Sequence, residues 1–336
     1  MPLKSYGVLI AKAVGVHREG NAQTPHYQIH LVDDAGTEYR AAVNVKSQES
    51  PSELLYFVAD DFRHPVTARV ADLPKGWNSL PPGPGGANLD FVRGNLFDPA
   101  AMRPLPPDVA GPDNDLADLL DHYVQRAITD DSARLYVFGE RWGPEPGVKD
   151  KIFGFLPGNG VHDVHMNQGN SPDFAKDDGT WQDGGLLVHF PGQNRWVGVF
   201  LAFQSQKWHT DDTTGHTVPE ADGTRPGPGT QPVRIAAALL NPRGPAPARQ
   251  TVTLINASPE PVDLTGWHIT DHDGTATPVP PGPLAPGTTR LFPLTDGTRP
   301  PGQGGGITLL DAHGLKAHGV SYTTDQTSRV GWTTVF

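Results

Sequence analysis

The stretch PGNGVHDVHMNQGN, residues 157–170, gathers chemically capable side chains between glycines: two histidines, one aspartate, three asparagines and one glutamine. An imidazole exchanges its proton near neutral pH, so it can act as a general acid or base, and a neighbouring carboxylate can orient it. On an extended chain Asp163, His165 and Asn167 share one face. A helical turn would pair His162 with His165 instead, but the flanking glycines disfavour a helix. The candidate catalytic residues are His162, Asp163, His165 and Asn167, and Gln168 is a candidate substrate ligand.

A candidate metal site follows this stretch. Asp183 in WQDGGLLVHF stands before a predicted buried strand, and His189 lies near the end of that strand on the same face. Together with His165 they form a predicted ligand set for zinc, manganese or calcium. The chain has no cysteine, so no thiol cofactor is expected. No nucleotide cofactor is expected either, because no GxGxxG follows a strand and no P-loop is present.

A predicted hairpin supplies further polar side chains. In PHYQIHLVDDAGTEYRAAVNVKS, residues 25–47, histidines and glutamine alternate with apolar residues, as on a strand with one buried face. If the register pairs His30 with Arg40 and His26 with Asn44, these side chains share one face, whereas a slip of one residue would separate them. A solvated sheet face is the plainer interpretation. The candidate substrate-binding residues are His26, Gln28, His30, Arg40 and Asn44.

Several familiar catalytic signatures are missing. The sequence has no HExxH, no HxK pair and no GxSxG elbow, so it predicts neither a classical zinc protease nor a serine hydrolase. A hydrolase, and more narrowly a metal-dependent phosphoesterase or nuclease, remains the leading hypothesis. Two alternatives stay open: the polar residues form a network that braces long loops, or they line a non-catalytic ligand pocket of a binding or scaffolding protein.

The elements that must position these residues are mostly short strands. The apolar runs at 133–143, 151–158, 184–190 and 195–205 are bounded by glycine or proline and predict buried strands. The spacing of leucines within 111–130 predicts one amphipathic helix. The fold class is mainly β with some α: a β-rich α+β domain over 1–208, a linker rich in Gly, Pro, Thr and Asp over 209–231, and a β-sandwich over 232–336.

Residues 232–336 resemble the lamin tail domain, an immunoglobulin-like sandwich, in ALLNPRG, VTLINAS, DLTGWHITD, GGGITLLDAHG and the closing GWTTVF. The resemblance implies that Trp267 is a core residue and that Asn256 forms a turn at a strand end. It also implies a targeting module that binds protein, nucleic acid or an envelope component. In bacteria such tails are often joined to hydrolases, nucleases and phosphoesterases.

Residues 5–208 resemble the YukJ-like family of uncharacterised bacterial proteins. The resemblance rests on YGVLIAKAV, SPSELLYFVADDFRHPVT, RGNLFDPAAMRPLPPD, FGERWGPEP and GVHDVHMNQGN, besides the hairpin and helix sequences already described. It identifies a family and implies no particular reaction.

Charge and composition exclude some classes of function. The formal net charge is −11, and all of it falls on residues 1–231, which a non-specific nucleic-acid binder would not show. The N-terminus lacks the pattern of a signal peptide, and no window reaches 18 apolar residues. We therefore expect a cytoplasmic protein without a transmembrane segment.

Overall fold

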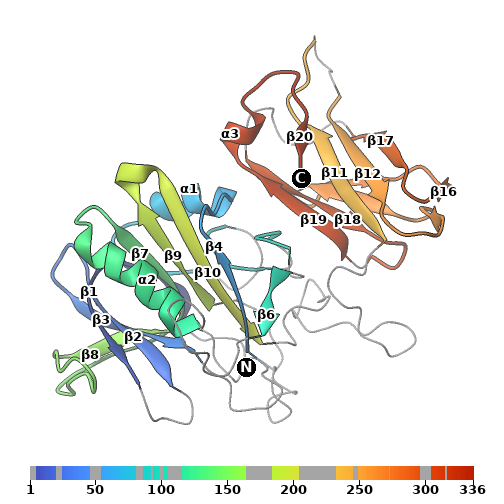
Figure 1. Ribbon diagram of the computed structural model, residues 1–336. Helices are drawn as coiled ribbons and strands as arrows, with labels where there is room; N and C mark the ends of the chain where they lie inside the picture. Colours follow the sequence, from blue (N-terminus) through green and yellow to red (C-terminus); the bar gives the residue numbers. More distant parts are fainter. Residues whose placement is uncertain are drawn as a thin grey trace. The chain divides into compact units, whose positions relative to one another are not determined.

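The computed structural model describes residues 5–19, 25–45, 54–80, 86–91, 94–98, 101–104, 116–163, 184–203, 232–244, 249–271, 273–295, 304–314 and 316–336. The chain forms two compact units, coloured blue to yellow and mostly orange to red in Figure 1. Unit 1 comprises Met1–Phe62, Val66–Asp90 and Ala101–Thr217; unit 2 comprises Arg63–Pro65, Phe91–Ala100 and Val218–Phe336. Both units are rich in strands, so the predicted mainly β class is confirmed. The predicted linker, 209–231, lies outside the described residues.

Unit 1 is built on one ten-stranded sheet with the order β5-β1-β2-β3-β8-β7-β9-β10-β4-β6. Its strands are β1 (Tyr6–Arg18), β2 (His26–Val32), β3 (Glu38–Asn44), β4 (Leu54–Ala59), β5 (Gly76–Ser79), β6 (Arg103–Pro104), β7 (Arg134–Glu145), β8 (Gly158–His162), β9 (Gly184–Phe190) and β10 (Arg195–Phe203). The helical segments are α1 (Pro65–Ala71), which begins at the last residue of a unit 2 segment, α2 (Leu116–Thr129) and the 3-10 turn η3 (Pro191–Gln193). Among the described helices, none is both long and apolar enough to cross a membrane.

Five of these strands close into a barrel. Strand β1 pairs with β2 along its second half and with β7 along its first half. Strand β3 pairs with β8 in parallel, and β8 pairs with β7, which completes the circle β1-β2-β3-β8-β7. Strand β1 changes partner between Ala11 and Lys12, and a register shift follows between Ala13 and Gly15. With α2 preceding the fourth barrel strand, this is the connectivity of an OB fold.

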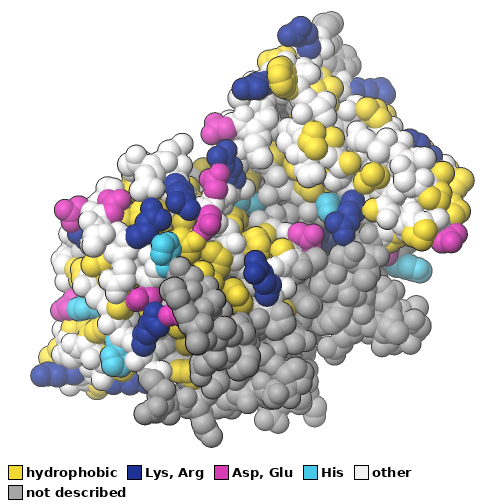
Figure 2. Space-filling model, in the orientation of Figure 1, with side chains coloured by type: hydrophobic (Ala, Val, Ile, Leu, Met, Phe, Trp, Pro, Cys, Tyr) yellow, Lys and Arg dark blue, Asp and Glu magenta, His cyan; other side chains and the backbone are white. Residues whose placement is uncertain are grey.

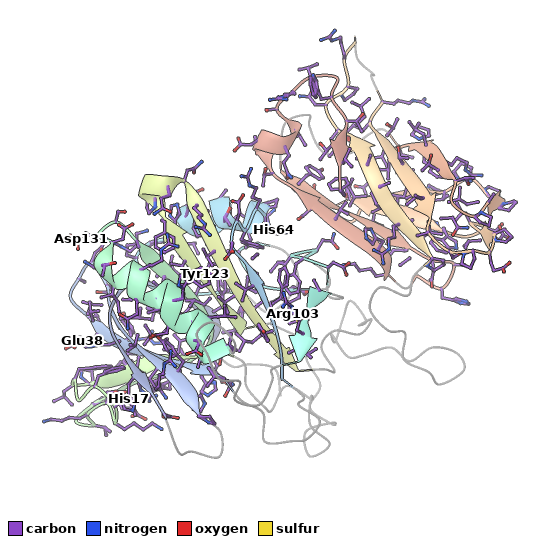
Figure 3. All side chains as sticks on the ribbon, in the orientation of Figure 1. His17, Glu38, His64, Arg103, Tyr123 and Asp131 are labelled. Atoms are coloured by element: carbon purple, nitrogen blue, oxygen red, sulfur yellow. The ribbon has the colours of Figure 1, made fainter. Side chains whose placement is uncertain are left out.

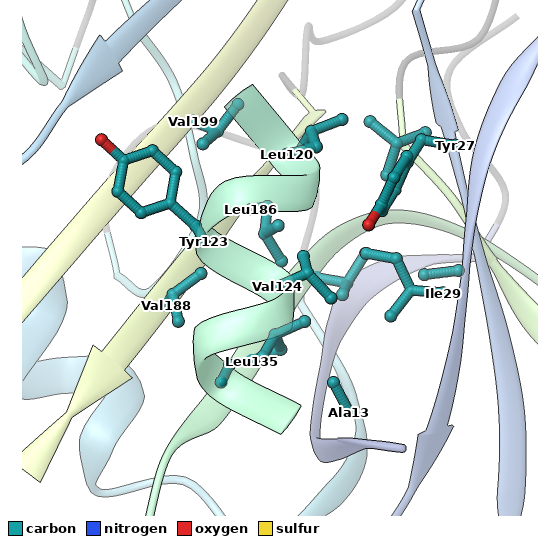
Figure 4. Close-up of a cluster of buried hydrophobic side chains, with 14 of the residues drawn as sticks. Ala13, Tyr27, Ile29, Leu120, Tyr123, Val124, Leu135, Leu186, Val188 and Val199 are labelled. Carbon is teal, nitrogen blue, oxygen red and sulfur yellow. The ribbon is translucent and has the colours of Figure 1, made fainter. Parts of the chain in front are cut away.

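The barrel interior and helix α2 share one hydrophobic core. Tyr27 and Ile29 of β2 point inward and are fully buried. Leu120 and Val124 of α2 belong to the same cluster, which also takes in Leu186 of β9 (Figure 4). The predicted amphipathic helix is therefore confirmed. Its apolar stripe packs on the barrel core and on residues of β9 and β10, and β9 is joined to the barrel by its pairing with β7.

The register of the hairpin is the one on which the predicted polar face depended. His26 lies opposite Asn44, and His30 lies opposite Arg40. The side chains of His26, Gln28 and His30 therefore project from the outside of the barrel, together with those of Arg40 and Asn44. Strand pairing thus brings the five candidate substrate-binding residues of the hairpin onto one face.

One predicted strand is wrong. Residues 151–157 are not extended but complete a loop between β7 and β8, which begins only at Gly158. Asp150 organises the loop, since its Oδ1 accepts hydrogen bonds from the backbone N–H groups of Ile152 and Phe153. Two phenylalanines of the run are sheltered by packing on the barrel instead of by pairing: Phe153 and Phe155 stack on His30, with ring centroids 4.8 and 5.4 Å away, whereas Leu156 is exposed.

Unit 2 contains two four-stranded antiparallel sheets, β17-β12-β11-β20 and β15-β14-β18-β19, and the short pair β13-β16. Its elements are β11 (Val233–Leu239), β12 (Thr251–Asn256), β13 (Val262–Asp263), β14 (His268–Asp271), β15 (Ala276–Pro278), β16 (Pro283–Leu284), β17 (Thr289–Pro293), β18 (Gly305–Leu310), β19 (Lys316–Tyr322), α3 (Thr324–Thr327) and β20 (Thr334–Val335). Residues of both sheets share one core, which includes Trp267. Asn256 is fully buried and donates to the carbonyls of Glu260 and Leu284, so both inferred roles are confirmed.

A segment from the first hundred residues belongs to unit 2. Asn95 donates from Nδ2 to Thr308 Oγ1 at 3.1 Å and to the carbonyl oxygens of Ile307 and Val320, both at 3.3 Å. A Cβ at Gly319 would lie 1.9 Å from Asn95 Oδ1, so only glycine leaves room for this contact. The structural units are therefore not contiguous in the sequence.

Acidification is expected to destabilise unit 2 through His318. Burial, with help from Arg234 and Lys316, lowers the pKa of this imidazole to about 4, and its Nδ1 accepts a hydrogen bond from the N–H of Ile235. The folded-state pKa lies below the unfolded value, so the unfolded chain takes up the proton first. The stabilisation is complete above about pH 6.5 and is lost as the pH falls to about 4, by up to about 3 kcal/mol.

Differential scanning calorimetry of the full chain between pH 7 and pH 4 measures this effect. In a His318→Gln variant, the melting temperature of unit 2 should fall less between pH 7 and pH 4 than it does in the parent. His313→Gln, at an exposed turn, is the matched control and should behave as the parent. An unchanged pH dependence in His318→Gln would refute this origin of acid sensitivity.

Candidate functional site

A cleft of about 500 Å³ opens on the outer face of the barrel. Strands β2, β3, β7 and β8 and the β7–β8 loop line it. Its volume falls within the range of ordinary ligand pockets, about 300–1,000 Å³. The lining residues are His26, Gln28, Arg40, Ala42, Trp142, Glu145, Val148, Lys149, Asp150, Lys151, Gly158 and His162.

Two histidines meet in this cleft. His26 Nε2 and His162 Nε2 lie 3.1 Å apart, and the ring planes are nearly perpendicular at 82°. The residues come from β2 and β8, which flank β3 on opposite sides. Residue Ala42 of β3 lies directly opposite His162, and its small side chain lets the rings lean over the central strand. Nitrogen atoms this close hold either a shared proton or a common cation between them.

Glu19 fixes the orientation of His26. Its Oε2 accepts hydrogen bonds from the backbone N–H of His26 at 3.0 Å and lies 3.1 Å from ring Nδ1. Burial opposes ionisation of Glu19, but these bonds and one from Gln28 outweigh it and hold the pKa of Glu19 below its usual value. The carboxylate therefore favours the tautomer of His26 with a proton on Nδ1, which leaves the Nε2 lone pair facing His162.

A chain of buried hydrogen bonds supports this arrangement. Gln28 donates to Glu19 Oε1 at 2.8 Å and accepts from Arg40 Nη1 at 2.8 Å. Arg40 Nε donates to Asp150 Oδ2 at 2.7 Å, and the guanidinium carbon lies 4.6 Å from the ring centroid of Trp142. Burial works against ionisation of Asp150, but the N–H of Phe153, Arg40 and the N–H of Ile152 hold its pKa below the usual value.

Asp163 and Asn44 brace the strands. Asp163 is 1% exposed, and its Oδ1 accepts from the backbone N–H of Asn44 at 3.1 Å and from Asn44 Nδ2 at 3.3 Å. The backbone N–H of Asp163 donates to the carbonyl of Ala42. Neither residue lines the cleft. Their contacts hold the end of β8 against β3, which keeps His162 in place.

Two other predicted residues lie outside the cleft lining. His30 is hydrogen bonded to Glu38 Oε2 at 2.8 Å, near the start of β3 (Glu38 is labelled in Figure 3). His189 stacks on Trp196, with centroids 4.0 Å apart, and burial beside Lys75 lowers its pKa. The remaining candidates, His165, Asn167, Gln168 and Asp183, lie outside the described residues. Among the described side chains, no group of three or more potential metal ligands is present.

Sequence reasoning missed several members of the site. Glu19 follows β1, whereas Trp142, Lys149, Asp150 and Lys151 come from the end of β7 and its loop. Glu19 has its partners 7 and 9 residues away, at His26 and Gln28, but the partners of the others are distant in sequence: 110 residues separate Arg40 from Asp150. No local pattern marks such contacts, because they depend on the closure of the barrel.

Charges on the visible surface of unit 1 are interspersed. Figure 2 shows lysines, arginines and carboxylates of the described residues alternating over this unit, with no broad basic field on the drawn face. The cleft differs locally, since Arg40, Lys149 and Lys151 line it beside the carboxylates of Glu145 and Asp150.

Comparison with known proteins identifies relatives of the first two thirds of the chain. The family model described as "Uncharacterized conserved protein (DUF2278)" matches residues 1–215. A relative from Bacillus subtilis (strain 168), "Uncharacterized protein YukJ", is 43% identical over 227 residues, which cover 67% of this chain and 99% of the relative. No solved structure gives a significant match. The predicted family resemblance is confirmed, and unit 1 carries most of it.

Proposed function

The chain belongs to the DUF2278 family, and we propose that its barrel cleft is the active site of a hydrolase that acts on an anionic ester of the phosphodiester type. One observation carries the proposal. His26 and His162, from strands distant in sequence, meet at 3.1 Å in an open cleft, with Glu19 behind His26.

The cleft offers the groups that such a reaction needs. Hydrolysis of a phosphodiester requires activation of a water molecule and stabilisation of negative charge on phosphorus oxygens. Arg40 and Asp150 neutralise each other in a buried ion pair, which leaves Lys149 and Lys151 against Glu145 on the lining of the cleft, in a chain whose net charge is −11. This local balance favours an anionic ligand. The imidazole pair supplies the reacting centre, because imidazole nitrogen atoms can accept a proton or hold a cation near neutral pH.

The position of the cleft supports the same proposal. In OB folds, ligands lie across the second and third strands, between the loop after the first strand and the loop before the fifth. Here β2, β3 and the β7–β8 loop all contribute residues to the lining of the cleft, and Glu19, directly after β1, contacts His26. The fold alone identifies no reaction.

Unit 2 is proposed to be an immunoglobulin-like, lamin-tail-like sandwich that delivers unit 1 to its target. The buried Trp267 and the core shared by two four-stranded sheets support this assignment. The proposed targets remain those implied by the resemblance: protein, nucleic acid or an envelope component.

A non-catalytic ligand-binding function is the second candidate. The observation that favours it is the extent of internal hydrogen bonding: Gln28 is 1% exposed and Arg40 is 7% exposed, so both are already engaged. A cleft with this preformed lining binds a polar ligand at low entropic cost, whether or not chemistry follows.

Hydrolysis of bis(p-nitrophenyl) phosphate and of short single-stranded oligonucleotides by the purified full chain tests the proposal. We expect turnover that falls at least about 100-fold in His162→Gln. The free energy of unfolding should change by less than about 1 kcal/mol, because His162 is partly exposed. His122→Gln, at an exposed position on α2, is the control. Saturable binding of these ligands without turnover would favour the second candidate, and turnover that is equal in His162→Gln would refute the first.

A further inference from the structure

We infer that His26 and His162 form a binding site for one borderline divalent cation, with zinc as the reference ion. The inference rests on the cleft of the proposed function but not on catalysis there. It assigns the metal to residues other than the ligand set predicted from the sequence, which is His165, Asp183 and His189.

The distance between the two nitrogen atoms suits a common ion. Zinc–nitrogen bonds of about 2.0–2.1 Å to two atoms 3.1 Å apart enclose an angle of about 100°, close to tetrahedral geometry. His26 projects from β2 and His162 from β8, and both strands pair with β3, so the backbone fixes the separation of the two ligands. When the ion replaces the proton that the two rings share, each ring turns so that its Nε2 lone pair points at the ion instead of at the other nitrogen.

Glu19 orients His26 from the side of the ring that faces away from the proposed ion. Histidine ligands of metals usually donate their second ring N–H to a carboxylate, which fixes the tautomer and makes the ligating nitrogen more basic. Glu19 Oε2 takes this position at 3.1 Å from His26 Nδ1. It also binds the backbone N–H of His26, so the ring is oriented before any ion arrives.

The donor atoms determine the class of ion. Two imidazole nitrogens favour zinc, copper or nickel over magnesium and calcium, which prefer oxygen ligands. The described residues provide two ligands, and the pair opens into the cleft. The remaining coordination positions face the space where a ligand would lie, and water or a substrate oxygen can fill them.

Metal titration of the full chain, previously treated with a chelator, tests the inference. Zn²⁺ affinity is measured by calorimetry, and Co²⁺ serves as a visible-absorption probe of nitrogen coordination. We expect one site whose affinity falls at least about tenfold in His26→Gln and in His162→Gln, and by about tenfold in Glu19→Gln. His122→Gln should retain the parent's affinity.

Three results overturn the inference. The first is no Zn²⁺ binding to the parent, and the second is a Zn²⁺ affinity in both histidine variants that equals that of the parent. The third is a Co²⁺ spectrum that is the same in His162→Gln as in the parent. Failure of the proposed function looks different. If Zn²⁺ binding depends on His26 and His162 but the protein hydrolyses no phosphodiester, the proposed function is refuted and the metal site is supported. If the chelator-treated protein hydrolyses phosphodiesters with a requirement for both histidines but binds no Zn²⁺, the function is supported and the metal site is refuted.

Discussion

Replacing Arg40 by methionine is expected to lower the free energy of unfolding of unit 1 by about 3 kcal/mol at neutral pH. The Arg40 side chain is 9% exposed and that of Asp150 is 1% exposed, so the substitution leaves a buried carboxylate without its cation. Two backbone N–H groups still contact Asp150, which places the cost at the lower end for a broken buried pair. Gln28 also loses its donor, so the support of Glu19 and His26 weakens.

The pH dependence identifies the cause. Without Arg40 the folded-state pKa of Asp150 rises, so the penalty applies where the carboxylate is ionised and shrinks as the pH falls towards about 4. Urea unfolding of the variant at pH 7 and at pH 4.5 measures this change. Asp150→Asn combined with Arg40→Met should recover part of the loss at pH 7. A penalty that is equal at both pH values would show that lost packing, rather than the unpaired charge, is responsible.

Replacing Gly160 by alanine is expected to cost at least about 3 kcal/mol and to abolish ligand binding in the cleft. A Cβ at this position would lie 2.1 Å from the backbone oxygen of Arg40 and 2.2 Å from a ring carbon of Trp142. Gly160 pairs with Arg40 where β3 and β8 run in parallel, so relief of the clash must separate the two strands that close the barrel. His162, two residues later on β8, would then move away from His26.

Gly192 provides the matched control. It lies in η3, and a Cβ there would meet nothing within 4 Å. Gly192→Ala should therefore change the free energy of unfolding by less than about 0.5 kcal/mol. Thermal melting of both variants measures the loss of stability, and ¹⁵N–¹H spectra show whether the strands of the barrel have moved. A Gly160→Ala protein that melts like the parent would contradict the described closure of the barrel.

The polar face of the hairpin shows how far sequence reasoning could go. Alternation along residues 26–32 assigned Tyr27, Ile29 and Leu31 to the core, because successive side chains on a strand point to opposite sides. The same pattern put Gln28 with the polar residues, as observed. It could not show that Gln28 would be buried, since the groups that cover it come from Glu19 and Arg40.

The loop before β8 shows where local patterns fail. Residues 151–158 have the composition of a buried strand, yet most of them form a loop, because Asp150 caps the turn and Phe153 packs on His30. The meeting of His26 with His162 likewise depends on barrel closure, which no short stretch encodes. Residue types gave the candidates, and only the pairing of β3 with β8 selected this pair from among fourteen histidines.

The most direct test of the central claim is a double-mutant cycle on kcat/KM for phosphodiester hydrolysis, with His26→Gln, His162→Gln and the double variant. If the two imidazoles act as one reacting centre, each single substitution lowers kcat/KM at least about 100-fold, and the double variant is only a few-fold worse than the weaker single variant. Losses that multiply in the double variant, or activity that survives both substitutions, would contradict the account.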